Sequence, residues 1–126
     1  MNDLSNTIDV SVTTRYLAEH SNPKDDRYVF AYDITIRNNG ESSAQLLSRH
    51  WIITDGDGKT QEVRGSGVVG EQPVIDAEDE YSYSSGTLMA TAVGSMQGSF
   101  TMRTEDGEEF EASIAPFSLA VPGVLH

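Results

Sequence analysis

The segment Gly65-Ser66-Gly67-Val68-Val69-Gly70 matches the pattern G-x-G-x-x-G. In dinucleotide-binding enzymes these glycines let the backbone approach a pyrophosphate at the N-terminus of a helix, whose free N–H groups hold the anion. Here Glu71-Gln72-Pro73 follows directly, with no helical period and no βαβ unit after it. No Lys-Ser or Lys-Thr ends the glycine run, as a P-loop requires. The segment is therefore predicted to be a surface loop.

This loop is also the main candidate for a binding surface. Its glycines permit exposed backbone N–H groups and the close approach of a ligand or partner, and functional contacts concentrate on loops held by a rigid scaffold. The alternative is a structural turn that only connects two sheets. The residues predicted to bind are Arg64, Gly65, Gly67, Gly70, Glu71, Gln72 and Pro73.

Two acidic segments are candidates for metal sites. Asp55-Gly56-Asp57-Gly58-Lys59-Thr60 begins like a calcium-binding loop, but a lysine occupies the third ligand position and Ser66 stands where a bidentate Glu is required, so a hairpin turn is predicted. The run Asp76, Glu78, Asp79 and Glu80 could hold Mg²⁺ loosely, although a solvated loop is favoured. Without cysteines or paired histidines, we expect no tight metal site and no cofactor.

Catalysis by a histidine base needs an imidazole beside a nucleophile and an orienting acid. His20 lies in a predicted loop and His126 ends the chain, which leaves His50 on a predicted strand. A lone strand histidine is more often a surface or structural residue. We therefore expect a binding module rather than an enzyme.

Composition narrows the classes of partner. The chain has 126 residues, a net charge of -12 from eight basic and 20 acidic residues, and no cysteine. This charge repels nucleic-acid phosphates and anionic lipid surfaces, so neither is an expected partner. No apolar run approaches the roughly 18 residues of a membrane helix, and the amino terminus has no signal-peptide pattern. We expect one domain, residues 1–126, in the cytoplasm.

Alternation of apolar and polar residues dominates the chain and predicts strands with one buried face. Turn signals such as Asn38-Asn39-Gly40 and Glu105-Asp106-Gly107 separate them, and the four prolines fall at predicted loops or strand ends. The pattern predicts an all-β fold, an antiparallel β-sandwich of the immunoglobulin or fibronectin type III kind. The predicted strands cover residues 8–13, 30–37, 44–55, 60–64, 80–83, 96–103 and 109–114.

The apolar phase of these strands also predicts the core. In the segment 44–55, Leu47, Trp51 and Ile53 share one predicted face, and Arg49 interrupts that apolar row without an explanation in the sequence. A tryptophan on a central strand is commonly buried in such folds. The residues predicted to be buried are Val10, Tyr32, Ile34, Trp51, Phe100 and Ile114.

Three stretches and the chain's ending together resemble the ApaG family. The stretches are Arg49-His50-Trp51-Ile52-Ile53-Thr54-Asp55-Gly56, then Val63-Arg64-Gly65-Ser66-Gly67-Val68-Val69-Gly70-Glu71-Gln72-Pro73, and Gly94-Ser95-Met96-Gln97-Gly98-Ser99-Phe100; the ending is Ile114-Ala115-Pro116-Phe117-Ser118-Leu119. His50 stands where that family commonly has an aromatic such as Tyr.

This resemblance implies a fibronectin type III-like sandwich and no established catalytic activity. It also implies an association with cobalt resistance and magnesium efflux, under the alternative name CorD. Similar domains in eukaryotic F-box proteins and in a polymerase-delta-interacting protein imply protein binding. Two hypotheses follow: a protein-interaction module with an unidentified protein partner, or a module that binds pyrophosphate or a nucleotide weakly through the glycine-rich loop.

Overall fold

Antiparallel strands make up most of the computed structural model, which describes residues 4–123. Three short 3₁₀ helices, η1 (Leu4–Thr7), η2 (Ala18–His20) and η3 (Pro23–Asp25), lie before the second strand. None of the helices within residues 4–123 is long and apolar enough to cross a membrane. The strands are β1 (Ile8–Tyr16), β2 (Tyr28–Asn38), β3 (Ala44–Asp55), β4 (Thr60–Ser66), β5 (Val74–Ile75), β6 (Glu80–Met89), β7 (Val93–Thr104) and β8 (Glu109–Ala120).

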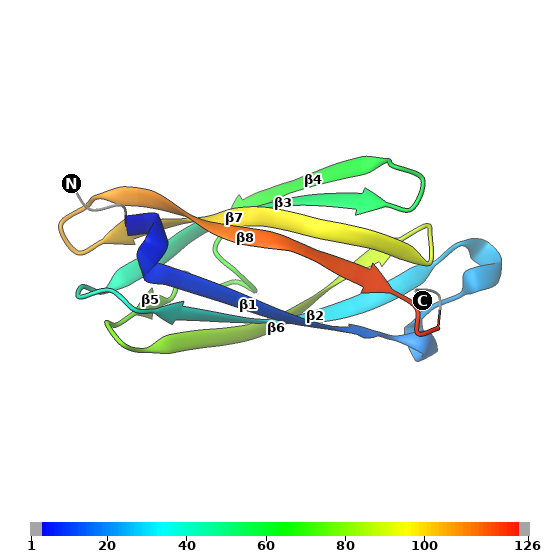
Figure 1. Cartoon of the computed structure of the whole chain (residues 1–126), viewed down its shortest axis with the longest axis horizontal. Helices are drawn as coiled ribbons and strands as arrows, with labels where there is room; N and C mark the ends of the chain where they lie inside the picture. The colour runs from blue at the N-terminus through cyan, green and yellow to red at the C-terminus, as the bar shows by residue number, and fades with distance from the viewer. Residues whose placement is uncertain (1–3, 124–126) are drawn as a thin grey trace.

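The strands form two sheets that pack face to face (Figure 1). One sheet has the order β1-β2-β6, and the other has the order β4-β3-β7-β8, with the two-residue strand β5 also paired to β3. Every pairing is antiparallel. The predicted antiparallel β-sandwich is confirmed. The prediction lacked β5, because two residues are too few to show a period.

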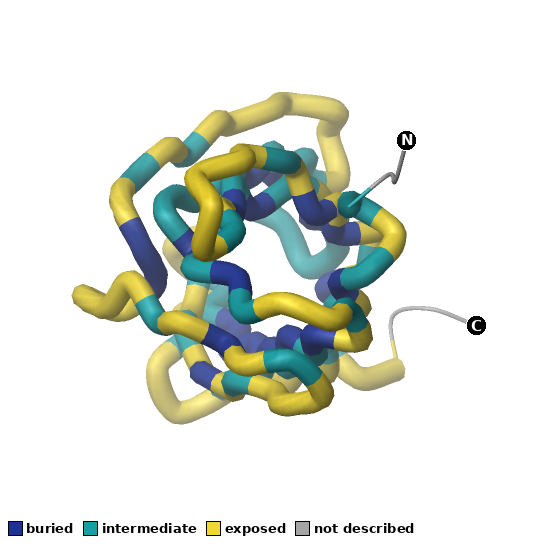
Figure 2. The backbone as a smooth tube through the Cα atoms, turned by 90° about the vertical axis from the view of Figure 1, so that its left-hand side faces the viewer, coloured by how far each residue is buried: buried dark blue, intermediate teal, exposed yellow. Residues whose placement is uncertain are grey.

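The buried residues lie between the sheets, and along most strands they alternate with more exposed ones (Figure 2). Trp51 is buried at the centre, and the rings of Tyr32, Phe100 and Phe117 surround it with centroids 5.5, 6.2 and 5.9 Å away. Such edge-to-face contacts add to the free energy of burial. The predicted burial of Tyr32, Ile34, Trp51, Phe100 and Ile114 is confirmed.

A β-bulge in β3 corrects the predicted face of that strand. The register with β7 shifts between Leu46 and Ser48, so Leu47 is the extra residue. Leu46 is fully buried, whereas Leu47 is only partly buried, and the prediction that Leu47 shares the face of Trp51 was wrong. An extra residue changes the phase of alternation along a strand. Beyond the bulge, the inward positions are those of Arg49, Trp51 and Ile53.

Two further differences arise at sheet edges. Val10 is only partly buried, contrary to the prediction, because β1 is an edge strand that is covered on fewer sides. Pro116 lies inside β8 and not at a strand end. There Phe117 pairs with Met96 and Ile114 with Gly98, so Pro116 falls in a bulge of an edge strand. A bulge tolerates the missing N–H donor.

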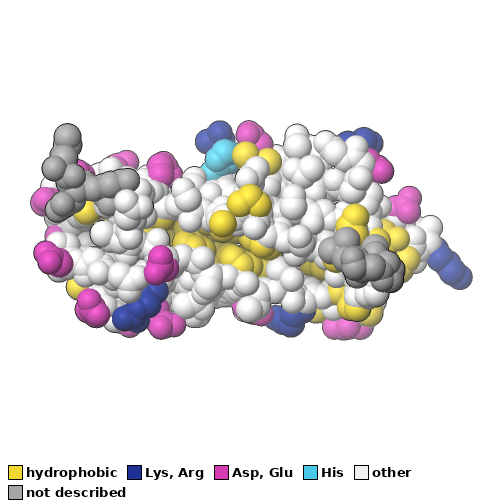
Figure 3. Space-filling model, in the orientation of Figure 1, with side chains coloured by type: hydrophobic (Ala, Val, Ile, Leu, Met, Phe, Trp, Pro, Cys, Tyr) yellow, Lys and Arg dark blue, Asp and Glu magenta, His cyan; other side chains and the backbone are white. Residues whose placement is uncertain are grey.

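The two long seams of the sandwich differ. On one side β1 lies beside β8, and a band of hydrophobic side chains runs along the line between the sheets (Figures 1 and 3). Acidic side chains are scattered around this band in the same view. On the other side, β4 and β6 are the last strands of their sheets. The opening between β4 and β6 positions the site described next.

Candidate functional site

A groove runs along the opening between β4 and β6. It consists of three adjoining cavities of about 280, 450 and 470 Å³ that share lining residues. We call this feature the β4–β6 groove. Its central lining residues are Tyr32, Arg49, Trp51, Gln61, Val63, Tyr83, Ser85 and Thr87.

Small inward-facing side chains explain why the groove exists. Along β6 the more buried residues alternate with exposed ones, and this inward series contains Ser85 and Thr87 after Tyr83. Across the opening, Gly65 pairs with Arg49, and Gln61 with Ile53, so both β4 residues share the inner face. Strand side chains alternate between faces with period two. Because hydroxyls and a glycine replace bulky apolar groups here, the two sheets are not bridged by packed side chains.

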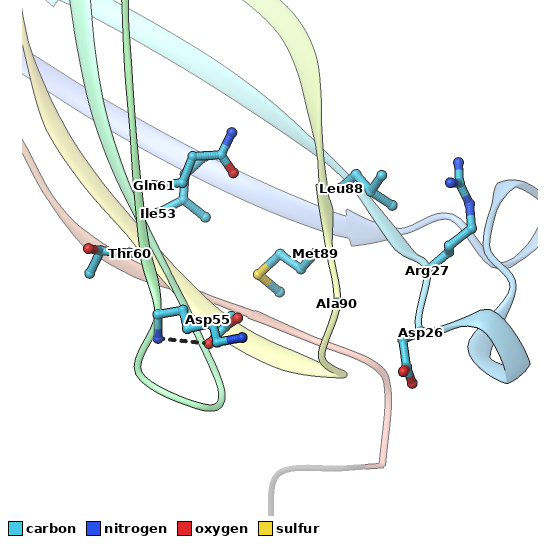
Figure 4. Close-up of a pocket in the computed structure, with 10 residues that line it drawn as sticks. Asp26, Arg27, Ile53, Asp55, Thr60, Gln61, Leu88, Met89 and Ala90 are labelled. Carbon is cyan, nitrogen blue, oxygen red and sulfur yellow. Dashed lines mark hydrogen bonds between the residues drawn. The ribbon is translucent and has the colours of Figure 1, made fainter.

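The end of the groove near the β3–β4 hairpin is drawn in Figure 4. Met89 of β6 points toward the hairpin, where Ile53, Thr60 and Gln61 lie, while Leu88 points away from it. Met89 is buried and Leu88 is 46% exposed. The hairpin turn is held by Asp55, whose Oδ1 accepts hydrogen bonds from the N–H groups of Asp57 and Lys59 at 2.9 and 3.0 Å.

Arg49 is the cation at the middle of the groove, where it lines two of the three cavities. It lies two residues before the buried Trp51, so its side chain shares the inner face of β3. Its Nη1 donates to the carbonyl oxygens of Ser66 and Gly67 at 3.0 and 2.9 Å. A Cβ at Gly65 would lie 2.7 Å from three guanidinium atoms, so a larger residue at this position would displace the Arg49 side chain from its present place.

Tyr83 stands beside Arg49 in the smallest cavity. It is only 9% exposed, and its hydroxyl has no hydrogen-bond partner among the described residues. Burial raises the pKa of this phenol, with the nearby Tyr32 acting in the same direction and Arg49 opposing both. The hydroxyl is consequently protonated at neutral pH and able to donate.

The glycine-rich loop forms one end of the groove. It makes a tight turn in which the N–H groups of Val68 and Glu71 donate to each other's carbonyl oxygens at 2.8 and 2.9 Å. Val69 and Gly70, the central residues, have φ values of 43° and 82°. Positive φ at both positions is the mark of a type I′ turn, and it strains a β-branched residue. Val69 is nevertheless 57% exposed at the rim of the groove.

The predicted binding residues of the loop separate into groups in space. Arg64 lies exposed on the outer face of β4, Gly65 packs against the Arg49 guanidinium, and Gly70 lines the groove. Gln72 and Pro73 tie the loop to β3: the Gln72 side-chain amide donates to the Leu47 carbonyl at 2.8 Å, and the Leu46 N–H donates to the Pro73 carbonyl at 2.9 Å.

Gly67 and Glu71 hold the turn together. A Cβ at Gly67 would lie 2.2 Å from the Glu71 carbonyl oxygen. The Gly67 N–H donates to the Leu47 carbonyl at 2.8 Å. The loop therefore has structural contacts, whereas its predicted binding role stays a prediction.

The acidic run has partners within the protein. Glu78 and Glu80 lie 3.8 and 3.7 Å from the Arg37 guanidinium, and the Ser43 hydroxyl donates to Asp76 at 3.0 Å. Within residues 4–123, no three His, Asp or Glu side chains are grouped closely enough to hold a metal ion.

His50 lies on the outer face of the larger sheet, away from the β4–β6 groove. It pairs with Arg64 of β4 and Ser99 of β7. Its Nε2 is 3.5 Å from Oε1 of Glu62, which in turn lies 3.9 Å from the Arg64 guanidinium. These contacts are polar cross-strand pairs of an ordinary sheet surface.

Sequence reasoning missed Arg49 and Tyr83 as site residues. Arg49 was noticed only as a break in an apolar row, and Tyr83 was assigned to a strand without a role. The signal that points to the groove is the continuation of the inward phase of β6 into Ser85 and Thr87. Polar residues in the buried phase of a strand indicate an opening or a ligand.

Comparison with known proteins agrees with the resemblance of the sequence. The family model of the ApaG domain matches residues 18–104. Protein ApaG of Ectopseudomonas mendocina is 64% identical, and that of Azotobacter vinelandii 62% identical, each over 126 residues and 100% of both chains. The crystal structure of the putative ApaA protein from Bordetella pertussis is 48% identical with a TM-score of 0.90, covering 93% of this chain and 95% of that one. This chain belongs to the ApaG domain family.

Proposed function

We propose that this ApaG-family chain is a non-enzymatic protein-interaction module that binds a segment of a partner protein in the β4–β6 groove. The observation that carries the proposal is the position of the groove between two terminal strands, β4 and β6. Within the described residues, the outer edges of these strands have no strand partner. Unpaired edges present N–H and C=O groups to which an extended segment can add.

The lining of the groove suits a protein segment. Its floor contains the aromatic side chains of Tyr32, Trp51 and Tyr83, and exposed apolar side chains lie at its rim, Val69 at 57% and Leu88 at 46%. Aromatic floors and apolar anchors characterise the central part of protein interfaces. The polar Ser85 and Thr87 supply hydrogen-bonding groups beside them.

In this proposal, the association of ApaG proteins with cobalt resistance and magnesium efflux works through a protein contact in the cytoplasm and not through a bound cation. The pairing of Glu78 and Glu80 with Arg37 supports this, because those carboxylates already have a cationic partner. The net charge of -12 disfavours nucleic acid and anionic lipid as partners.

A weak pyrophosphate or nucleotide site on the glycine-rich loop is the alternative, and the structure favours it less. Such a site relies on backbone N–H groups that are free to donate to phosphate oxygens. The N–H groups of Gly67, Val68 and Glu71 instead donate to carbonyl oxygens of the protein. Arg49 also uses Nη1 on the carbonyl oxygens of Ser66 and Gly67.

Site-specific photo-crosslinking in cells tests the proposal. A photoreactive amino acid is placed at Gln61, which lines the groove, or at Glu62, its neighbour on the opposite face of β4. Both residues are exposed, so each replacement leaves the core unchanged. We expect Gln61 to form a covalent adduct with a distinct protein that mass spectrometry identifies, and Glu62 not to form it.

Equal labelling at both positions, or no adduct at Gln61, would contradict the proposal. A parallel titration follows backbone amide shifts on adding GTP or pyrophosphate to the purified chain. Saturable shifts confined to residues 65–71 at micromolar ligand would instead support the nucleotide alternative.

A further inference from the structure

Among the described residues, Arg49 is the partly buried arginine without a carboxylate partner, whereas Arg27 and Arg103, which also lack one, are exposed to solvent. Arg15, Arg37 and Arg64 each lie within 4 Å of an acidic side chain, at 3.3, 3.7 and 3.9 Å for their closest pairs. Arg49 has no such pair within residues 4–123, although the chain carries a large excess of acidic residues. A partly buried charge without a counter-charge is costly unless it is hydrogen-bonded.

The hydrogen bonds of Arg49 leave much of its guanidinium available. Nη1 donates to two backbone carbonyls, whereas a guanidinium has five N–H donors arranged in a planar fork. The remaining donors belong to Nη2 and Nε. A planar fork fits the two oxygens of a carboxylate.

A second donor shares the cavity with Arg49. The hydroxyl of Tyr83 has no partner among the described residues, although the side chain is more than nine-tenths buried. Buried hydroxyl groups usually have a hydrogen-bond partner, and leaving one without a partner destabilises the fold. Both residues line the same cavity, which has a volume of about 280 Å³.

We propose that the partner segment is an extended peptide with one acidic side chain, whose carboxylate binds the Arg49 guanidinium and accepts a hydrogen bond from the Tyr83 hydroxyl. This inference rests on the proposed function of the groove. It adds the chemistry of the partner: a single Asp or Glu supplies the counter-charge that Arg49 lacks, and the acceptor that Tyr83 lacks, at one place.

The dimensions of the groove set the length of the peptide. It runs along β4, whose seven residues span roughly 20 Å at the rise of an extended strand, so six or seven peptide residues match it. Residues on either side of the carboxylate contact apolar groups, Val69 at one end and Val63 toward the other. The net charge of -12 repels a longer acidic tract, so the peptide carries one acidic residue and not several.

Two peptide libraries test this inference directly. Both consist of acetylated and amidated heptapeptides, random except for the central residue, which is Glu in one library and Gln in the other. The full-length protein is immobilised, and retained peptides are identified by mass spectrometry. We expect Glu peptides to be retained about tenfold better than their Gln counterparts, because a paired carboxylate binds more strongly than an amide.

Tyr83→Phe separates binding from folding. The buried hydroxyl has no partner in the free protein, so its removal should leave the unfolding midpoint unchanged or raise it slightly. Affinity for the best Glu peptide should fall about tenfold, the loss expected for a hydrogen bond to a charged group. Tyr81→Phe is the matched control, since Tyr81 lies two residues away on the same strand and does not line the cavity. Its affinity should not change.

A second variant, Arg49→Gln, removes the guanidinium that is proposed to bind the carboxylate. It should abolish the preference for Glu over Gln peptides, while Tyr83→Phe keeps the inference testable if this variant fails to fold. Equal retention of both libraries by the wild-type protein, or unchanged affinity in Tyr83→Phe, would overturn the carboxylate site. The proposed function would survive this result, because a neutral peptide could still bind in the groove. If neither library is retained but free acetate shifts the backbone amide signals of the protein, the carboxylate does not come from a peptide, and the inference is wrong.

Discussion

Replacing Gly67 by alanine tests how the glycine-rich loop is built. The residue has φ of 59°, and an added Cβ would lie 2.2 Å from the Glu71 carbonyl oxygen. Gly70, three residues later, has φ of 82° but nothing within 4 Å of an added Cβ. Gly70→Ala therefore has only the free-energy cost of placing alanine at a positive φ, whereas Gly67→Ala has this backbone cost and a steric clash as well.

The two terms set the expected magnitudes. A non-glycine residue in the left-handed region loses roughly 1–2 kcal/mol, partly offset by the reduced entropy of the unfolded chain, which leaves about 1 kcal/mol for Gly70→Ala. Forcing the Glu71 carbonyl to move adds about 1–3 kcal/mol, the usual cost of overpacking. Gly67→Ala should therefore destabilise the protein by about 2–4 kcal/mol.

Urea unfolding followed by tryptophan fluorescence measures the difference, since Trp51 is the single tryptophan and is buried. With a typical urea slope near 2 kcal/mol per molar, Gly67→Ala should unfold at about 1 M less urea than Gly70→Ala. Coincident midpoints for the two variants would refute the close contact between Gly67 and Glu71. Gly70→Ala, which keeps the fold, then serves to ask whether the loop contacts a partner.

Other expectations concern strain, core, metal and pH. Val69→Asn should raise stability by about 1 kcal/mol, because asparagine tolerates the positive φ of this turn, and a lower melting temperature would contradict the strain. Phe100→Ala should lose about 3–5 kcal/mol in urea unfolding, whereas a loss below about 1 kcal/mol would show that the fully buried ring is not part of the core. Calorimetric titration with Co²⁺ should find no stoichiometric sub-micromolar site; one that persists after the acidic run 76–80 is neutralised would contradict both its absence and its expected location. Hydrogen bonds from Arg15 first, then from Ser84, lower the pKa of Asp33 below 3.8, so its contribution to stability is complete above that pH and is lost as the pH falls below it. Asp33→Asn should therefore flatten the acid side of the stability profile, and an unchanged profile would count against these contacts.

Much of the fold could be predicted because the alternation of apolar and polar residues along each strand shows which face of that strand is buried. Phe30, Tyr32, Ile34 and Ile36 alternate with Ala31 and then with polar residues, and all four are buried in β2. The same period located every strand longer than two residues. It went wrong at Leu47 and Val10, where a bulge and an edge position change the exposure of a residue without changing its type.

The candidate site could be predicted only in part. The glycine-rich loop stood out, since glycines mark positions of positive φ, and the structure has positive φ at Gly67 and Gly70. The contact between Gly65 and the Arg49 guanidinium could not be predicted, because Arg49 belongs to a neighbouring strand. Tyr83 looked like an ordinary strand residue, although its hydroxyl lies without a partner in a cavity.

The all-β class, the positions of the long strands, the central tryptophan and the family follow from the amino-acid sequence, because each depends on local alternation or on motifs within one stretch of chain. The contact of β1 with β8, the groove between β4 and β6, and the meeting of Arg49 and Tyr83 in that groove follow from the packing of the sheets. Arg49 and Tyr83 are 34 residues apart in the chain and belong to different sheets. Their proximity depends on the order of the strands and on how the two sheets pack, and alternation along a single strand contains information about neither.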